Sequence, residues 1–569
     1  MVKYKAPLRE YEFILREVLG IEKELGSYPE YSEATWDMIE MISEQFAKIN
    51  EDYWLPSAKV GDEVGVKFED GNVIVPESMK EATNVVIEGG LTQLFGHQEY
   101  GGMEFPNVIN VLSDEMSCAA NMSLGIYLGL TKGAYHCIHK HGSQEIRQRY
   151  LPKFLSGEWF GTMCLTEAHC GTDLGLIRTS AKPNGDNYLV SGQKIFISCG
   201  EHDMGENIIH LVLARLPDAP KGVKGISLFL IPKFKVNDDG TIGERNNVNC
   251  VSIEEKMGVH GSATCVMSFE ESTGYLIGEL NDGLAAMFSM MNTERIAVGL
   301  QGLGQAEIAY QNALAYSKDR IQGRDLKGAR NPEDEADPLI VHPDVRRMLL
   351  RSKAIIDSGR MLACWTALAI DKYEKDPDPT IRKENFDLVE LMTPIIKAML
   401  TDYGVEITSE MLQIFGGHGY IKEYGMEQFY RDVRIAPIWE GTNGIQALDL
   451  AGRKMPQHMG RLLRRFFHPA LDFIEDNKED VNLKEFVEPF AKALKGLQKT
   501  SMYMAQKGLS NPYEIGAAAT DYLRQFGLVA MGYMWLLMLK VAFEKKDLDN
   551  YYEHKIITAR FFFERILPE

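Results

Sequence analysis

The hydrophobic pattern of this chain changes twice, and that change most constrains its fold. Apolar residues recur at helical spacing through residues 8–50 and 78–153, short β-rich runs with turn residues fill 160–269, and helical spacing returns from 283 to about 454. Apolar positions three to four apart indicate amphipathic helices, whereas short β-branched and aromatic runs bounded by turns indicate strands. The sequence therefore predicts a mainly α protein with a central β domain.

The length of the chain predicts several domains, because 569 residues exceed what one core usually organises. We place an N-terminal helical domain at residues 1–159, a middle β domain at 160–280, a helical bundle at 281–455 and an additional helical domain at 456–569. A polar, acidic segment within 323–343 interrupts the bundle and is predicted to be exposed. Residues 525–539 form the longest uncharged apolar run, which is shorter than the roughly 18–20 residues that span a bilayer and is predicted to be a buried helix.

Charge and cysteine content disfavour several classes of protein. The formal net charge of −20 opposes binding to nucleic acids and anionic membranes, although an anionic ligand needs only a local basic patch. Eight scattered cysteines without a C-x-x-C pair indicate reduced intracellular thiols rather than disulfides or a zinc site. The termini lack a signal core, transit character and a peroxisomal tripeptide, so we expect a cytoplasmic protein.

Common cofactor and metal signatures are also missing from the sequence. His136, His139 and His141 lie beside Lys140 at the end of a helical pattern, so we predict no metal site there. Gly302 and Gly304 lie in a long helical pattern, where close helix packing explains them better than a dinucleotide fingerprint does. Without that fingerprint, a P-loop or a nucleophile elbow, a nicotinamide enzyme is disfavoured.

One carboxylate stands out within residues 435–450. Glu440 lies between an apolar approach and a glycine-bearing turn, and loss of hydration there should raise its pKa toward the range of a general base. Gly441 removes a side chain beside it, and Thr442 or Asn443 could cap the helix that follows. Taken alone, these residues fit a surface glutamate before a helix at least as well.

The segment Trp439-Glu-Gly-Thr442, followed by Ile-Gln on a helix, resembles the catalytic-base segment of acyl-CoA dehydrogenases. The upstream run Gln413-Ile-Phe-Gly-Gly-His-Gly-Tyr420 is similar to the same family, and the parts come in the family's order. The resemblance implies an N-terminal helical domain, a middle β-barrel and a C-terminal four-helix bundle. It also implies that Glu440 is the catalytic base, that Gly441 lies at the substrate and that FAD contacts Thr442. In this family Gln413, Gly416 and Gly417 contact the flavin of a neighbouring subunit, so a homo-oligomer, dimer or tetramer, is expected.

The middle domain carries two further resemblances. The run from Met163 to Asp173 resembles the family's flavin loop, and Lys194-Ile-Phe-Ile-Ser198 resembles the strand behind the flavin. The residues implied to contact FAD are Met163, Leu165, Thr166, Phe196 and Ser198. Gly171 and Thr172 are implied to approach the coenzyme A part of the substrate. Many relatives have Trp where Phe196 stands, a departure that keeps an aromatic ring to stack on the flavin but leaves the path of electron exit open.

Two arginines complete the set implied by the resemblance. Asn292 and Arg295 match a segment that binds the substrate's phosphopantetheine or 3′-phosphate, although the family often has Asp at position 292. Arg320 and Gln322 resemble the pair that contacts the FAD pyrophosphate across a subunit interface, and an arginine fork suits phosphate. In isolation each would be an ordinary surface residue.

The resemblance implies FAD-dependent α,β-dehydrogenation of an acyl-CoA thioester to the trans-2-enoyl-CoA. Glu440 would take the α-proton while the β-hydride passes to flavin N5, and an electron-transfer flavoprotein would be the acceptor. The added C-terminal segment is similar to a longer subclass that includes 3-(methylthio)propanoyl-CoA dehydrogenases and bacterial fatty acyl-CoA dehydrogenases, so either substrate fits. The alternatives are an acyl-CoA oxidase, a flavin monooxygenase of the same fold, and a non-catalytic FAD-binding relative that binds nucleic acid. The last two are opposed by Glu440, and the nucleic-acid binder also by the net charge.

Overall fold

The computed structural model describes residues 2–569, apart from the side chains of residues 292 and 293. The chain divides into two compact units. The bundle unit comprises Met1–Ala47, Pro106–Ala119 and Arg295–Glu569, and the sheet unit comprises Lys48–Phe105 and Ala120–Glu294. Two long helices, α6 (Asn107–His141) and α8 (Gly283–Asp319), contribute to both units, and α6 is interrupted at Asn121, where φ is −153° and ψ is 91°.

The sheet unit is built on a seven-stranded sheet with the order β3-β6-β7-β11-β5-β4, in which β10 also pairs with β11. Strands β3 and β6 are parallel and the other pairs are antiparallel. The strands are β3 (Trp159–Cys164), β4 (Ser180–Asn184), β5 (Asn187–Ser198), β6 (Asn207–Ala214), β7 (Ser227–Pro232), β10 (Val248–Ile253) and β11 (Thr264–Ile277). The predicted β block is therefore confirmed.

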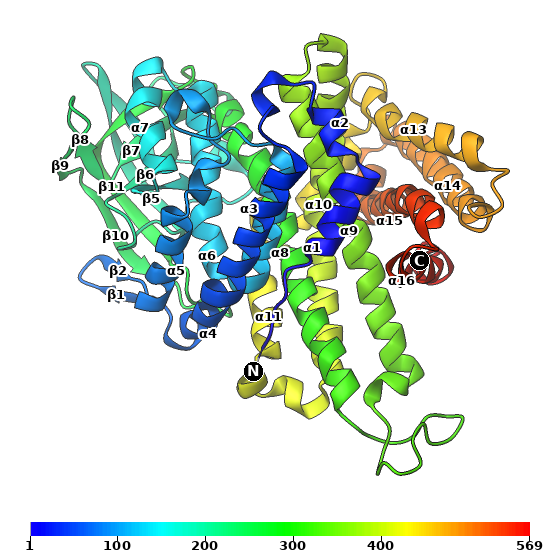
Figure 1. Ribbon diagram of the computed structural model, residues 1–569. Coiled ribbons are helices and arrows are strands. Elements are labelled where there is room, and N and C mark those ends of the chain that lie inside the picture. The colour runs from blue at the N-terminus through cyan, green and yellow to red at the C-terminus, as the bar shows by residue number, and fades with distance from the viewer. Residues whose placement is uncertain (1) are drawn as a thin grey trace. The chain divides into compact units, whose positions relative to one another are not determined.

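Besides the first part of α8, the sheet unit contains two small hairpins and four helices (Figure 1). The hairpins pair β1 (Lys67–Glu69) with β2 (Asn72–Ile74), and β8 (Phe234–Val236) with β9 (Ile242–Arg245). The helices are α4 (Leu55–Val64), α5 (Glu77–Glu88), the second part of α6, and α7 (Gln144–Leu155). Ser143 caps α7 by accepting a hydrogen bond from the Ile146 N–H at 3.3 Å.

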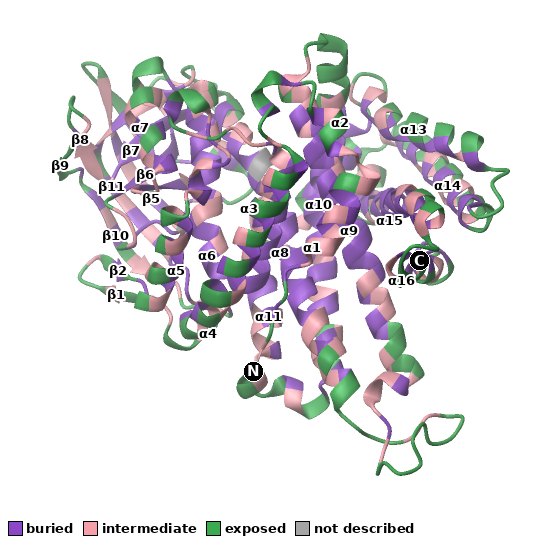
Figure 2. Ribbon diagram, viewed as in Figure 1, coloured by how far each residue is buried: buried purple, intermediate pink, exposed green. Residues whose placement is uncertain are grey.

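The core of the bundle unit consists of α8, α9 (Pro343–Lys375) and α10 (Pro379–Ile414). Helices α9 and α10 are buried along most of their middle parts, as Figure 2 shows. A Cβ atom on Gly302 would lie 2.3 Å from the Leu400 carbonyl oxygen, and one on Gly304 would lie 2.7 Å from the Glu115 carbonyl oxygen. These glycines thus allow close helix packing, as predicted from the sequence.

Four helices follow the bundle core: α13 (Arg461–Asn477), α14 (Lys484–Gly508), α15 (Pro512–Lys545) and α16 (Asn550–Phe561). Within the described residues, α15 is the single helix long and apolar enough to cross a membrane, and 78% of its most apolar window is buried. Burial to that extent is typical of a core helix. The prediction of a buried helix over residues 525–539 is therefore confirmed.

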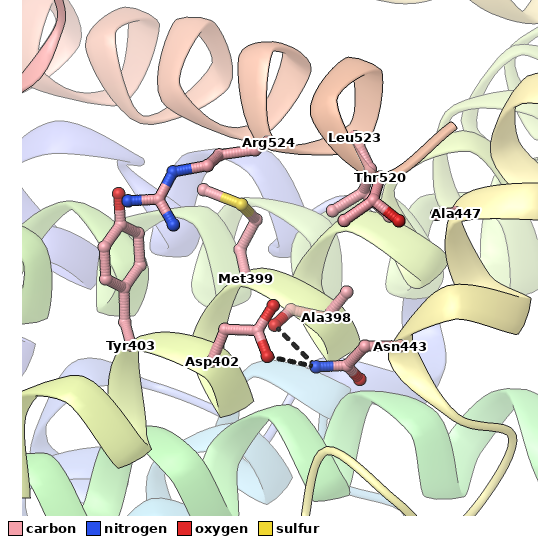
Figure 3. A pocket seen from close by; sticks show the side chains of 9 residues that line it. All are labelled: Ala398, Met399, Asp402, Tyr403, Asn443, Ala447, Thr520, Leu523 and Arg524. Atoms are coloured by element: carbon pink, nitrogen blue, oxygen red, sulfur yellow. Dashed lines mark hydrogen bonds between the residues drawn. The ribbon is translucent and has the colours of Figure 1, made fainter. Parts of the chain in front are cut away.

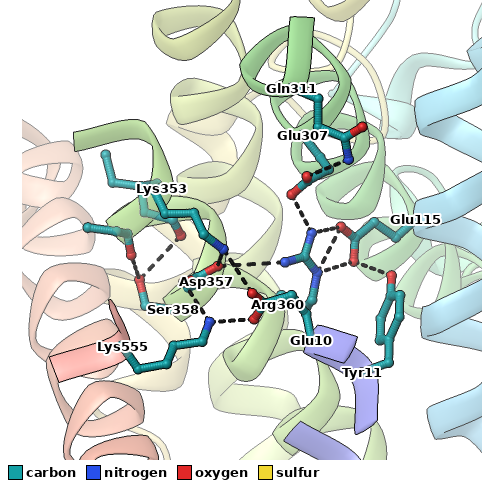
Figure 4. Close-up of polar contacts among 12 residues, drawn as sticks. Glu10, Tyr11, Glu115, Glu307, Gln311, Lys353, Asp357, Ser358, Arg360 and Lys555 are labelled. Atoms are coloured by element: carbon teal, nitrogen blue, oxygen red, sulfur yellow. Dashed lines mark hydrogen bonds and ion pairs between the residues drawn. The ribbon is translucent and has the colours of Figure 1, made fainter. Parts of the chain in front are cut away.

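A buried network of charged side chains connects the first of the N-terminal helices, through Glu10, to the bundle and to α16 (Figure 4). The N-terminal helices are α1 (Leu8–Tyr11), α2 (Ile21–Leu25) and α3 (Trp36–Ile49). Arg360 on α9 pairs with Glu115 and Glu307 at 2.5 and 2.7 Å, and Lys555 on α16 pairs with Asp357 at 2.7 Å. Because all these side chains are almost fully buried, each charge depends on its partners for stabilisation.

The polar segment between α8 and α9 is exposed, as predicted, but it is ordered around one carboxylate. Asp337 accepts hydrogen bonds from the backbone N–H groups of Asp325 at 2.8 Å and Arg330 at 3.0 Å. An isolated bridge joins Ile321 to Pro338 at the base of the segment.

Candidate active site

Glu440 lies on a tight turn between α11 (Met426–Val433) and α12 (Asn443–Asp449). Its φ is +54°, a left-handed conformation that costs about 1–2 kcal/mol for a residue with a Cβ atom. Gly441 follows with φ +83°, and a Cβ atom there would lie 2.8 Å from the Gln446 amide nitrogen. The turn thus needs glycine at position 441 and holds Glu440 in a strained backbone state.

Hydrogen bonds from α12 fix this turn. The Gln446 side chain, 1% exposed, donates to the carbonyl oxygens of Glu440 and Gly441, both at 3.2 Å. Thr442 is the N-cap, and its hydroxyl accepts from the Ile445 N–H at 3.4 Å. Of the two residues that the sequence offered as caps, Thr442 is the one that serves.

The surroundings of Glu440 change its proton affinity. The residue keeps intermediate exposure, but burial raises the pKa of its carboxyl group to about 7, and the positive charges of Arg295 and Lys397 oppose the rise. This is the direction predicted from the sequence. A carboxylate with such a pKa is suited to take a proton near neutral pH.

The backbone N–H of Glu440 is available for a ligand. Among the described residues, no acceptor takes a hydrogen bond from this group or from the N–H groups of Gly441 and Thr442, whereas those of Trp439 and Asn443 are bonded to carbonyl oxygens. The Arg295 Nε atom lies 3.5 Å from the Glu440 carbonyl oxygen on the same turn. A free N–H beside a carboxylate is an arrangement that can bind a carbonyl oxygen and deprotonate the adjacent carbon.

Sequence analysis did not identify Lys397, which lies on α10 and is fully buried. Its ammonium group donates to the Asn443 Oδ1 atom at 2.8 Å, and Asn443 is the first residue of α12. The available signal was a single lysine within the apolar run 391–400. A long side chain in such a run more commonly extends to solvent, so the signal was weak.

The flavin-loop residues predicted in the middle domain lie together in the sheet unit. The Thr166 carbonyl oxygen accepts from the Ile195 N–H at 2.9 Å, which brings the loop next to β5. Phe196 projects from β5 with 59% of its surface exposed and φ +57°. Met163, Leu165, Thr166 and Ser198 are half-buried, and Gly171 and Thr172 are exposed.

An ion pair beneath this loop holds it in place. The Lys194 ammonium contacts Glu167 at 2.8 Å and the Leu165 carbonyl oxygen at 2.9 Å. Glu167, His169 and Cys170 are also close enough to share a metal ion, but the Glu167 carboxylate already accepts from Lys194, Arg178 and Thr179. We therefore assign Glu167 to loop structure rather than to metal binding.

A second group of predicted residues lies at the ends of α8 and α10. The Tyr316 and Phe415 rings stack with centroids 4.0 Å apart, which brings these two ends together. The exposed residues there are Arg320, Gln322, Gln413, Gly416 and Gly417. Gln413 follows Lys397 on the same helix, and a rise of 1.5 Å per residue separates the two by about 24 Å along the axis. This group is therefore distinct from the turn that carries Glu440.

Arg295 is 7% exposed and lies at the turn that carries Glu440, whereas the side chain of Asn292 is outside those that the structure describes. Burial lowers the pKa of Arg295, and Asp449 and Glu440 oppose the shift. A buried arginine remains charged and supplies a fixed positive charge beside Glu440.

Two relatives match this chain over almost its full length. A 3-methylmercaptopropionyl-CoA dehydrogenase from Ruegeria pomeroyi is 39% identical over 573 residues, which cover 100% of this chain and 96% of the relative. This chain belongs to the acyl-CoA dehydrogenase family. A butyryl-CoA dehydrogenase from Syntrophomonas wolfei is 35% identical over 99% of this chain and 95% of its own length.

Four acyl-CoA dehydrogenase domain profiles match in order. They are the N-terminal domain at residues 40–158, the middle domain at 162–272, the C-terminal domain at 281–455 and an acetyl-CoA dehydrogenase C-terminal-like domain at 466–569. A crystal structure of an acyl-CoA dehydrogenase complexed with FAD from Bacillus anthracis has a TM-score of 0.76 and 20% identity, covering 94% of this chain and 87% of that one. The predicted acyl-CoA dehydrogenase fold is therefore confirmed.

Acyl-CoA dehydrogenases depend on FAD, and the sheet unit offers a surface that fits a flavin. A large aromatic side chain, Phe196, is exposed beside the half-buried Thr166 and Ser198, which carry hydroxyl groups. Flat aromatic and polar groups on one open surface suit a planar heterocycle with polar edges.

Proposed function

We propose that this protein oxidises an acyl-CoA thioester to the trans-2-enoyl-CoA, with Glu440 as the catalytic base. The observation that carries the proposal is the turn at Glu440, where a carboxylate with a pKa near 7 stands beside an unengaged backbone N–H. A thioester α-proton is weakly acidic, so its removal needs both a base and a donor for the developing enolate oxygen.

Each part of the turn has a role in this reaction. Glu440 takes the α-proton, its own N–H binds the thioester oxygen, and Gly441 leaves room for the thioester beside the backbone. One donor to the developing oxyanion is worth roughly 2.7–4 kcal/mol. Arg295 and Gln446 hold the turn through its carbonyl oxygens. Bound FAD would supply the acceptor for the β-hydride.

We assign the remaining predicted residues as follows. Met163, Leu165, Thr166, Phe196, Ser198 and Thr442 would contact the flavin, and Gly171, Thr172, Asn292 and Arg295 would contact the coenzyme A thioester. Arg320, Gln322, Gln413, Gly416 and Gly417 would bind the flavin of a second copy of the chain. Gln413 lies about 24 Å from Lys397 along α10, and this separation from the residues around Glu440 supports this part of the proposal.

The substrate is a fatty acyl-CoA or 3-(methylthio)propanoyl-CoA, and the names of the two full-length relatives support both choices. We further propose a cytoplasmic homo-oligomer that passes electrons to an electron-transfer flavoprotein. Peroxide formed in proportion to substrate during aerobic turnover would instead identify an oxidase.

The test is anaerobic stopped-flow reduction of the FAD-loaded protein by butanoyl-, octanoyl-, dodecanoyl- and 3-(methylthio)propanoyl-CoA. The substrate should bleach the wild-type flavin, and Glu440→Gln should retain FAD and bind acyl-CoA but bleach at least ~100-fold more slowly. The matched control is Glu423→Gln, which changes an exposed glutamate before α11 and should behave as wild type. Near-normal reduction in Glu440→Gln would show that another group is the base.

A further inference from the structure

The positive charge of a fully buried lysine, Lys397, must be balanced near the turn that carries Glu440. Lys397 is 0% exposed, and its one hydrogen-bonded side-chain partner within the described residues is the neutral amide of Asn443, at 2.8 Å. Removing an ammonium group from water is costly unless anionic groups stand nearby. The anionic groups that act on Lys397 are Glu440 and Asp402.

The Asn443 amide lies between the positively charged Lys397 and the negatively charged Asp402. Its Oδ1 atom faces the Lys397 ammonium, while its Nδ2 group donates to the Asp402 carboxylate at 2.7 Å and to the Thr401 hydroxyl at 2.9 Å. A flipped amide would direct its NH₂ group at the ammonium and its oxygen at the carboxylate, so one orientation is strongly favoured. Because Asn443 begins α12, this arrangement joins the lysine to the helix that follows the catalytic turn.

A small cavity, lined mainly by apolar groups, has Asp402 in its wall, as Figure 3 shows. Its volume is about 60 Å³, enough for water. It is lined by Ala398, Met399, Asp402, Tyr403, Asn443, Ala447, Thr520, Leu523 and Arg524. Three of these, Thr520, Leu523 and Arg524, come from α15, so the additional helices close the cavity behind the catalytic turn.

Arg524 is fixed next to this cavity. Its guanidinium lies 5.5 Å from the centre of the Tyr403 ring and 3.2 Å from the Glu406 carboxylate. Burial raises the pKa of Asp402, and the positive charges of Lys397 and Arg524 counteract the rise. Arg524 thereby favours the ionised Asp402 that Lys397 needs as a partner.

The charges around Glu440 and Lys397 come from several elements. Arg295 on α8 and Lys397 on α10 face Glu440, and Asp449, Arg453 and Glu390 face Arg295. Burial lowers the pKa of Lys397 to about 7, with Glu440 as the largest opposing charge. Glu440 and Lys397 therefore influence each other's protonation in the pH range in which the base must work.

We propose that Lys397, held by the Asn443 amide that Asp402 orients, is a positioning residue that favours the ionised form of Glu440 near neutral pH. The inference rests on the proposed role of Glu440 as base. It assigns the additional C-terminal helices a role in the active site, because Arg524 acts on Asp402 and through it on Lys397.

The test measures the protonation of Glu440 without any acyl-CoA. In the FAD-loaded resting protein, infrared difference spectra across a pH series show the protonated carboxyl C=O stretch, and the band absent from Glu440→Gln identifies Glu440. Removing the positive charge with Lys397→Met should move the midpoint of this band up by about one pH unit. Lys397→Arg keeps the charge and should stay close to wild type.

Variants of Asp402 and Arg524 test whether these residues act on Glu440 through Lys397. Asp402→Asn and Arg524→Met should shift the midpoint in the same direction but by less, and Lys383→Met, an exposed lysine on the same helix, should not shift it. If Lys397→Met does not fold, a shift in Asp402→Asn supports the proposal and an unchanged midpoint there overturns it.

An unchanged midpoint in folded Lys397→Met overturns the inference even if its flavin reduction is slow, because a purely structural role would affect the rate alone. Failure of every acyl-CoA to bleach the wild-type flavin would instead overturn the proposed function. The two failures are therefore distinguishable.

Discussion

The Lys194 ammonium and the Glu167 carboxylate form an ion pair 2.8 Å long, with side chains 0% and 5% exposed. Lys194 also binds the Leu165 carbonyl oxygen, so one buried cation connects β5 to the loop that we assign to the flavin. Burial would raise the pKa of Glu167, but Lys194 and the surrounding donors overcome it and lower that pKa. The loop's conformation thus depends on a charge pair with little access to water.

We expect Lys194→Met to destabilise the protein by about 3–5 kcal/mol, because it leaves the Glu167 carboxylate buried without its cation. The loop should also loosen, so the variant should lose FAD more readily. Urea unfolding and the ratio of flavin to protein absorbance measure the two effects. Lys182→Met, at an exposed position on the neighbouring strand β4, is the control and should change neither; equal stability of the two variants would contradict the role of the pair.

The rate of flavin reduction should depend on pH through Glu440. Its pKa is raised to about 7, and only the ionised form accepts the α-proton. Below pH 7 the second-order rate constant measured at subsaturating substrate, which reports ionisations of the free enzyme, should therefore fall about tenfold per pH unit, and above pH 7 it should level off. Anaerobic stopped-flow between pH 5.5 and 9 measures this profile. A rate that stays constant down to pH 5.5 would mean that the base has an ordinary carboxyl pKa.

The sequence could predict the elements of this fold but not all of its site. The β block of residues 160–269 was recognisable because its short runs contrast with helical spacing on both sides. The chain crosses between the two units at residues 47–48, 105–106, 119–120 and 294–295. Three of these crossings lie inside α3, α6 and α8, where no change in composition marks them.

The environment of Glu440 was only partly predictable. The apolar residues before it indicated the raised pKa, since they are its neighbours in sequence. Lys397 lies 43 positions earlier, and its role depends on how α10 packs against α12, which no local pattern records. The left-handed φ of Glu440 was equally hidden, because glutamate shows no preference for that conformation.

This φ leads to a prediction about backbone strain. Glu440→Gly and Glu440→Ala both remove the carboxyl group, but glycine adopts φ +54° without the Cβ clash. Glu440→Gly should therefore be more stable than Glu440→Ala by about 1 kcal/mol, after the greater flexibility of glycine in the unfolded chain is subtracted. Chemical denaturation of the two variants measures the difference. A more stable alanine variant would show that the turn relaxes and stores no strain.

The Arg360 network predicts a stability change that depends on pH. Burial would raise the pKa of Glu307, but Arg360 and Lys353 overcome it and hold that pKa below its usual range. In Arg360→Met the carboxylates of Glu115 and Glu307 lose their shared cation, which should cost about 3–5 kcal/mol at pH 7.

The sign of the pH dependence follows from Glu307. A depressed pKa stabilises the wild-type fold above the unfolded pKa of 4.5, and that contribution disappears as the pH falls through the folded value. Without Arg360, Glu307 should take up a proton at higher pH and become a neutral buried acid. The difference in unfolding free energy between wild type and Arg360→Met should therefore shrink as the pH falls from 7 toward 4.5. Urea unfolding at several pH values measures this difference, and Arg382→Met, which changes an exposed arginine, is the control. A difference that is constant with pH would show that lost packing, not lost charge, causes the destabilisation.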